Sequence, residues 1–237
     1  MIDTDTEKGR LVATAMKLAA ARPWRDISLR GIAEEAGVSL AVVRVHFDSK
    51  TAILAAFSRA ADEVVLRQAA GRQEGIGPRD AIFEVVMSRF DAMEPYKSAL
   101  RSIVRGAGRE NPDPGMLRAI LASQRWMLEA AGIDTSGAGG AVRTLGLASV
   151  YASVFHTWLD DDDPGLARTM AALDRRLRRG EQNLRALEDV CGVFGRIAGV
   201  FRRRPQQRGP AASGEPAREP RDIGPAPGPA PEPPSAT

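Results

Sequence analysis

Cysteine and histidine are scarce in this sequence of 237 residues. Its single cysteine, Cys191, cannot form an internal disulfide, which fits a reducing compartment. His46 and His156 are the only histidines, and neither has a nucleophile or a ligand partner at motif spacing. The sequence therefore argues against an enzyme and predicts neither a metal nor a cofactor.

Long hydrophobic runs are also missing. No stretch approaches the ~20 uninterrupted apolar residues that a transmembrane helix needs, and the opening MIDTDTEKGR is polar rather than a basic region followed by an apolar one. No two-residue hairpin signal lies between alternating segments, so strands are not expected. These absences predict an all-helical protein that resides in the cytoplasm.

The composition is that of an ordinary globular protein, with 43% hydrophobic and 27% charged residues. The net charge is only +3, and it is unevenly distributed. Residues 1–58 hold 8 Lys and Arg against 7 Asp and Glu, whereas residues 173–204 hold 9 Arg against 4 acids. Residues 205–237 contain ten of the sixteen prolines and almost no bulky apolar side chain, which predicts a disordered tail.

Apolar residues recur at helical spacing along most of the remaining sequence. The expected helices outside the segment discussed next cover residues 6–22, 79–93, 96–104, 116–131, 138–158 and 166–177. Asp160 to Asp163 precede Pro164. Acids at such a position suit the N-terminal end of a helix dipole, and we expect that role rather than metal binding.

Two short helices are predicted after the first long one. Ser28 is an N-cap candidate for the first of them, which ends at Gly37, a residue suited to the left-handed C-terminal cap. Ser39 caps the second, and Asp48 or Ser49 opens a longer helix. Short helices joined by a tight glycine turn can share one small core and cross each other.

This segment strongly resembles the DNA-binding domain of TetR-family repressors. ISLRGIAEEAGVS at residues 27–39 is followed, at the family's separation, by HFDSKTAIL at residues 46–54. The resemblance implies an all-α, TetR-like fold. It would have a three-helix helix-turn-helix head at residues 6–54, a helical-bundle body for ligand binding and dimerisation at residues 55–204, and the proline-rich tail at residues 205–237.

The resemblance also implies which residues meet double-stranded DNA, with the second short helix across a major groove. They are Arg30, Ser39, Leu40, Ala41, Arg44, His46 and Lys50. The alternatives are a capping or packing role for His46 and a solvated Lys50. The family usually has Tyr where this chain has Arg44 and commonly Pro where it has Asp48, so a phosphate contact is altered and a negative charge is added near the duplex. Base readout would then use thymine methyl contacts and arginine to guanine.

TetR-family proteins dimerise through their C-terminal helices and bind ligands among the central ones, and the same is implied here. The large side chains that could line an apolar pocket are Trp126, Met127, Tyr151, Phe155 and Trp158. The alternative is that these residues are plain core, since aromatic side chains carry much of any core's burial.

Residues 151–180 also resemble the lipid-binding proteins of ubiquinone biosynthesis, which have a TetR-like fold, do not bind DNA and touch the membrane with a C-terminal amphipathic helix. The last predicted helix carries an apolar stripe followed by three arginines at 202–204. Its main apolar residues are Leu187, Phe194, Ile197 and Phe201. Residues 181–204 would then make a peripheral membrane contact or, alternatively, a dimer interface.

Two functions follow from these patterns. The first is a homodimeric transcriptional regulator that responds to an apolar small-molecule or lipid ligand. The second is a lipid-binding accessory protein for quinone synthesis. The intact turn sequence favours the first, which is the function we predict. The placement of basic charge near the C-terminus and the last predicted helix favour the second, which is the alternative.

Overall fold

The computed structural model describes residues 1–71, 75–107 and 114–181. The chain divides into two compact units, residues 1–192 and 193–237, and every described residue belongs to the first. All regular elements of the described part are helical, as predicted. The predicted proline-rich tail and the predicted helix with Leu187, Phe194, Ile197 and Phe201 lie outside the described residues.

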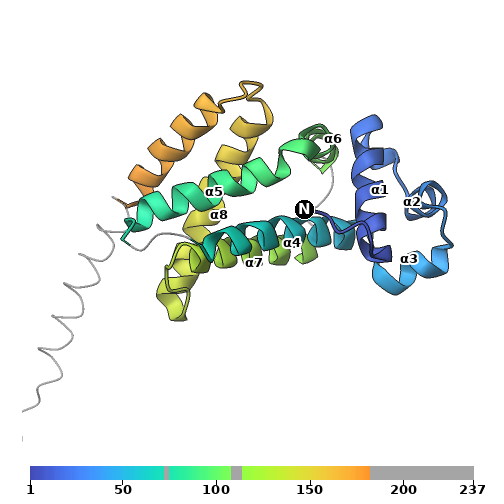
Figure 1. Ribbon diagram of the computed structural model, residues 1–237, viewed down its shortest axis with the longest axis horizontal. Helices are drawn as coiled ribbons and strands as arrows, with labels where there is room; N and C mark the ends of the chain where they lie inside the picture. The colour runs from blue at the N-terminus through green and yellow to red at the C-terminus, as the bar shows by residue number, and fades with distance from the viewer. Residues whose placement is uncertain (72–74, 108–113, 182–237) are drawn as a thin grey trace, which may run out of the picture. The chain divides into compact units, whose positions relative to one another are not determined.

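Figure 1 shows the order of the helices along the chain. They are α1 Glu7–Ala21, α2 Leu29–Ala36, α3 Leu40–His46, α4 Lys50–Ala69, α5 Pro78–Met93, α6 Lys97–Ala107, α7 Pro114–Ala130 and α8 Gly137–Leu159. Two 3-10 turns, η1 at Trp24–Asp26 and η2 at Glu94–Tyr96, follow α1 and α5. A last helical stretch covers residues 167–181.

Side-chain caps set where the helices of the head begin. The Ser28 hydroxyl accepts a hydrogen bond from the Gly31 amide at 3.0 Å, and Ser39 accepts one from the Val42 amide at 3.3 Å. Ser49, rather than Asp48, caps α4. Each cap satisfies an amide that has no partner within its helix. The predicted caps at Ser28 and Ser39 are therefore confirmed.

The head is held by one small core beneath these caps. Ile32 on α2, Val43 on α3, Phe47 in the following turn and Ile53 on α4 are at most 3% exposed. α2 packs on both α1 and α3. Because α3 is only two turns long, it depends on this packing for its position.

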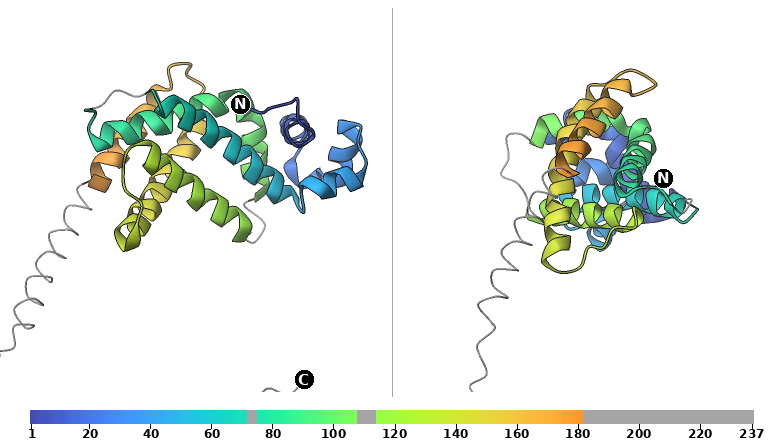
Figure 2. Two further views of the ribbon diagram at one scale, coloured as in Figure 1. Left: turned by 60° about the horizontal axis from the view of Figure 1, so that its bottom comes forward. Right: turned by 90° about the vertical axis from the view of Figure 1, so that its left-hand side faces the viewer.

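α4 belongs to both the head and the body. It follows α3 directly, contacts α1, and then packs against α5 and α7. Figures 1 and 2 show its first turn beside α3 and its far end among the body helices. α4 is therefore a continuous helix that connects the packing of the body to that of the head.

A buried polar network ties four body helices together. Arg89 on α5 forms an ion pair with Asp62 on α4, and its guanidinium also donates to the Ser58 hydroxyl and the Tyr151 phenol oxygen, each at 2.9 Å. Ser123 on α7 donates to Asp62 at 2.7 Å. Burial raises the pKa of Tyr151, although Arg89 acts in the opposite direction. Breaking one partner of such a buried pair typically costs about 3–5 kcal/mol, so this network fixes the relative positions of the body helices.

The acidic turn after α8 is a structural element. Asp161 accepts hydrogen bonds from the Thr169 amide at 2.8 Å and the Thr169 hydroxyl at 2.7 Å, and Asp163 accepts one from the Ala167 amide at 3.2 Å. Asp162 pairs with Arg101 on α6. These carboxylates cap the start of the last helical stretch, as expected from their place before Pro164.

Residues 1–71, 75–107 and 114–181 contain neither a candidate membrane span nor a candidate metal cluster. No helix there is both long and apolar enough to cross a bilayer. The same residues contain no group of three or more His, Cys, Asp or Glu side chains placed to hold a metal ion.

Candidate nucleic-acid interface

Helix α3 presents one face to the head and the opposite face to solvent. Val43 is 1% exposed, whereas Leu40 is 42% and Val45 is 79% exposed. Ala41 and Arg44 are also exposed. At 100° per residue, positions 40, 41, 44 and 45 fall on one side of the helix and 42, 43 and 46 on the other. We call the exposed set Leu40, Ala41, Arg44 and Val45 the α3 outer face.

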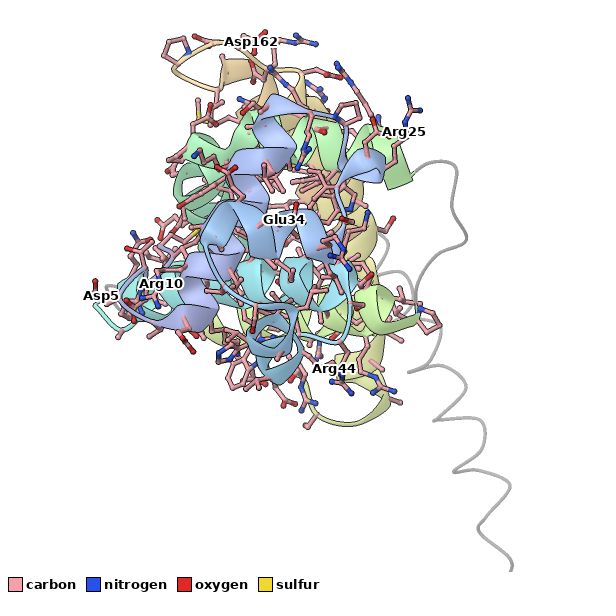
Figure 3. The ribbon with its side chains drawn as sticks, turned by 90° about the vertical axis from the view of Figure 1, so that its right-hand side faces the viewer. Asp5, Arg10, Arg25, Glu34, Arg44 and Asp162 are labelled. Atoms are coloured by element: carbon pink, nitrogen blue, oxygen red, sulfur yellow. The ribbon has the colours of Figure 1, made fainter. Side chains whose placement is uncertain are left out.

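Arg44 is the only charged side chain of the α3 outer face, and it is paired within the head. Its guanidinium forms an ion pair with Asp48, four residues further on, with side-chain exposures of 75% and 79%. An ion pair so exposed is worth about 0–1 kcal/mol. Figure 3 places Arg44 at the outer surface of the head. Arg44 can therefore exchange this partner for a base or a phosphate at little cost.

His46 and Lys50 have partners in the head. The Nε2 of His46 lies 3.4 Å from a Glu7 carboxylate oxygen on α1. The ammonium of Lys50 donates to the Trp24 carbonyl oxygen at 3.1 Å and lies 5.0 Å from the centre of the indole ring. Lys50 is thus half-buried and attaches η1 to α4. For both residues a phosphate contact stays a prediction.

The remaining predicted contacts lie at the rim of the α3 outer face. Arg30, on α2, is exposed. Ser39 is also exposed, with its hydroxyl engaged in the α3 cap. The amide end of α3 is therefore already ordered, as a helix terminus that faces a phosphate would need.

Sequence reasoning missed Val45. Its signal was present, because Val45 follows Ala41 by four residues and therefore shares its side of the helix. Of the valines in this helix, only Val43 was predicted to lie in the core, and Val45 was given no role. In the structure only Val43 is fully buried, and Val45 is the most exposed large hydrophobic residue of the described chain.

Four of the five predicted ligand residues lie in one hydrophobic core, and the fifth does not. Tyr151, Phe155 and Trp158 of α8 stack around Phe90 of α5, with ring centroids of Phe90 5.3 Å from Tyr151 and 5.2 Å from Trp158. Met127 is buried in the same hydrophobic core. Trp126 is 55% exposed and stands apart from it.

Sequence reasoning also missed Gln124, a buried polar residue of α7. It is 1% exposed, and its Oε1 is the single buried side-chain atom in the described residues that has no hydrogen-bond partner. A buried acceptor without a donor is costly, and such groups commonly mark a place where a ligand or water binds. No feature of the linear sequence distinguishes Gln124 from a surface glutamine.

Comparison with known proteins connects this geometry to a family. Residues 11–57 match the family model of the N-terminal domain described as "Bacterial regulatory proteins, tetR family". This range contains α2, α3 and the α3 outer face. No curated protein sequence matches the chain.

Solved structures resemble the chain over a longer range. The TetR transcriptional regulator from Nitrosomonas europaea is 23% identical, with a TM-score of 0.58, over 75% of this chain and 99% of its own. A TetR transcriptional regulator from Rhodococcus sp. RHA1 is 18% identical, with a TM-score of 0.53, over 72% of this chain and 93% of its own. At these identities the likeness concerns the fold. Residues 11–57 therefore match the helix-turn-helix domain of the tetR family, and the chain as a whole has the fold of solved TetR regulators.

Proposed function

We propose that this protein is a dimeric transcriptional regulator that binds double-stranded DNA through the α3 outer face and responds to a small apolar ligand. The observation that carries the proposal is the exposure of Leu40, Ala41, Arg44 and Val45 within an intact helix-turn-helix domain. A short helix with its capped N-terminus and outer face free is shaped to enter a major groove. Arg44 supplies hydrogen bonds to guanine, and the apolar residues supply contacts to thymine methyl groups.

The exposed side of α8 supports dimerisation. Its exposed residues between 138 and 152 repeat at helical spacing and are all small or apolar and uncharged. They are Ala138, Gly139, Ala141, Val142, Leu145, Gly146, Ser149 and Ala152. Arg143 is half-buried, and its guanidinium donates to the Asp134 carbonyl oxygen at 3.1 Å. Small side chains on one continuous face allow two helices to approach closely, and Leu145 is 59% exposed there. A second copy of the chain would bury this face against its own.

The centre of the body supports ligand binding. The aromatic residues Phe90, Tyr151, Phe155 and Trp158 stack in the core of the body, where Phe90 and Trp158 are fully buried. Gln124 offers a buried acceptor without a donor. We infer an apolar ligand that carries one hydrogen-bond donor, such as a hydroxyl group. Its apolar part would contact the aromatic rings, and its donor would bind the Gln124 oxygen. A ligand that binds more tightly when α4 is in one position than in another favours that position. In a dimer this changes the distance between the two DNA-binding heads.

No observation in the described residues favours the alternative of a lipid-binding protein for quinone synthesis. Residues 151–180 form the end of α8, the acidic turn and most of the last helical stretch. The predicted membrane contact at 181–204 lies almost wholly outside the described residues.

A salt titration of DNA binding tests the proposed function. Duplexes from the region flanking the protein's own gene would be compared with scrambled duplexes by fluorescence anisotropy. We expect affinity for one flanking duplex to fall steeply with salt and to exceed that for the scrambled one, because phosphate contacts release counterions and base contacts add preference.

Substitutions in the same assay assign the contact to α3. Arg44→Ala should weaken binding to the preferred duplex by about 1–3 kcal/mol, as the loss of a bidentate guanine contact does. Arg67→Ala, at an exposed position on α4 away from the α3 outer face, is the matched control. Equal affinity for all duplexes, with no effect of Arg44→Ala, would reject the proposal.

A further inference from the structure

A cleft of about 480 Å³ lies between the end of α1 and η1 on one side and α6 on the other. Its lining residues are Ala19, Ala20, Ala21, Arg22, Pro23, Arg25, Ser98, Arg101, Ser102, Arg105 and Gly106. The volume is within the range of small-molecule sites in proteins. We call this feature the junction cleft.

The junction cleft is strongly basic. Four of its lining residues are arginines, two are serines and none is acidic. Two of the arginines have nearby carboxylates, Asp26 at 3.5 Å from Arg25 and Asp162 paired with Arg101. Arg105 forms no ion pair with any described residue, whereas the Arg22 guanidinium reaches over Gly31 of α2 and interacts with the Glu35 carboxylate. Among the described residues, the Arg105 guanidinium is therefore the one cleft arginine with no neighbouring carboxylate.

The local sequence explains how these side chains meet. Residues 98, 101, 102 and 105 recur at helical spacing, so the serines and arginines of α6 share one side of that helix. They face the three alanines at 19–21, whose short side chains leave the space open. The Ser102 hydroxyl accepts from the Trp24 amide and donates to the Arg22 carbonyl oxygen, each at 3.1 Å. Backbone groups of the head are thus fixed to α6 at the floor of the cleft.

We propose that the junction cleft binds a small molecule carrying at least two phosphate or carboxylate groups. Guanidinium groups bind such anions through paired, charge-assisted hydrogen bonds. Arg25 comes from the head and Arg101 and Arg105 come from α6, so a ligand with two anionic groups can engage both sides. Bound in this way, it holds the head against α6.

The position of the cleft separates it from the α3 outer face. Figure 3 shows Arg25 and Arg44 far apart on the side of the molecule that carries the head. Points that are separated in a projection are separated at least as far in space. A duplex lying along α3 therefore has no need of the junction cleft, which favours a small anion over the DNA backbone as its occupant.

Calorimetric titration of the full chain with inorganic pyrophosphate tests this site. We expect saturable binding that the double substitution Arg25→Gln and Arg105→Gln weakens at least tenfold. Both side chains are exposed, so the variant keeps the buried core intact. Arg105→Lys should retain part of the affinity. The matched control, Arg59→Gln with Arg67→Gln, removes two charges from exposed positions of α4 and should bind as the unchanged protein does.

Hydrogen exchange provides a second measurement that needs no DNA. Pyrophosphate should slow amide exchange in residues 19–26 and 98–106 together, because the ligand contacts both segments. Absence of binding, or equal weakening by both double substitutions, would overturn the proposal. A second outcome would also overturn it: no pyrophosphate binding by the unchanged protein, together with weaker DNA binding by the Arg25 and Arg105 variant. The cleft would then bind phosphates of the DNA duplex. Failure of the titration alone leaves the proposed regulator function intact.

Discussion

Gln124 is a buried residue whose side-chain oxygen accepts no hydrogen bond from any described residue. An unsatisfied buried polar group costs about 1–3 kcal/mol relative to a solvated one. We expect Gln124→Met, which keeps the length of the side chain and removes the polar atoms, to raise the free energy of unfolding by about 1 kcal/mol. Chemical denaturation with and without Gln124→Met measures this difference.

The control for Gln124 is Ser123→Ala, the neighbouring residue. Ser123 donates to the buried Asp62 carboxylate, so its removal should lower stability. A loss of stability in both variants would contradict the interpretation of Gln124 as a residue that serves a ligand rather than the fold.

The stability of the protein should depend on pH through the ionisation of Asp161. Burial acts to raise the pKa of this carboxyl, but hydrogen bonds from the Thr169 hydroxyl and amide outweigh burial, and its pKa lies below the ordinary value of 3.8. A lowered pKa means that the contribution to stability is present above the unfolded-state value and is lost as pH falls through the folded-state value. We expect this contribution to disappear below pH 3.8.

Equilibrium unfolding measured from neutral pH into strong acid checks this expectation. Thr169→Val removes one donor and should flatten the stability profile in acid. Asp161→Asn, which does not ionise, should flatten it further and lower stability at neutral pH. An unchanged profile in Asp161→Asn would show that other carboxylates determine acid unfolding.

At the scale of the helical elements, local chemistry determines where helices begin and end. The caps at Ser28 and Ser39 and the turn at Gly37 were predicted because each depends on neighbours within a few residues. η1 was not predicted, since Pro23 was interpreted only as the end of the first helix. That turn is held by Ser102, which is 78 residues away from Trp24 along the chain. Periodicity carries no information on such a contact.

The candidate site was predictable to a similar extent. The family pattern identified α3 and most of its outer face, because helix spacing and turn chemistry are local. The partners of Lys50 and His46 come from α1 and η1, so the sequence could not indicate that both side chains are engaged. Gln124 and the junction cleft likewise depend on how separate helices pack.

Gly37 supplies a prediction about the turn between α2 and α3. Its φ of 67° lies in the left-handed region, and no atom stands within 4 Å of the place where a Cβ would be. Gly37→Ala should therefore lower stability by about 1–2 kcal/mol through backbone strain alone. Gly37→Asn should cost less, because asparagine tolerates this conformation. Thermal unfolding of both variants distinguishes strain from a steric clash, which would penalise the larger asparagine more.

At the scale of the whole molecule, the uncharged face of α8 predicts the state of assembly. Leu145→Glu would place a carboxylate in the centre of that face and should convert a dimer to a monomer, because an interface cannot bury an unpaired charge at low cost. Sedimentation velocity over a range of concentrations measures the change. Arg59→Glu, on α4, alters charge without touching α8 and should leave the assembly unchanged. A protein that is monomeric before substitution, or dimeric after it, would exclude α8 as the interface.

The length of α4 has a mechanical consequence. A 20-residue helix is about 30 Å long. Rotating such a rod by about 5° about its distal end displaces the opposite tip by about 2.6 Å, which is close to the ~3.4 Å rise between successive nucleotides. In the proposed regulator, a small rearrangement of the side chains near Ala69 would therefore move the head by close to one nucleotide step along the double helix.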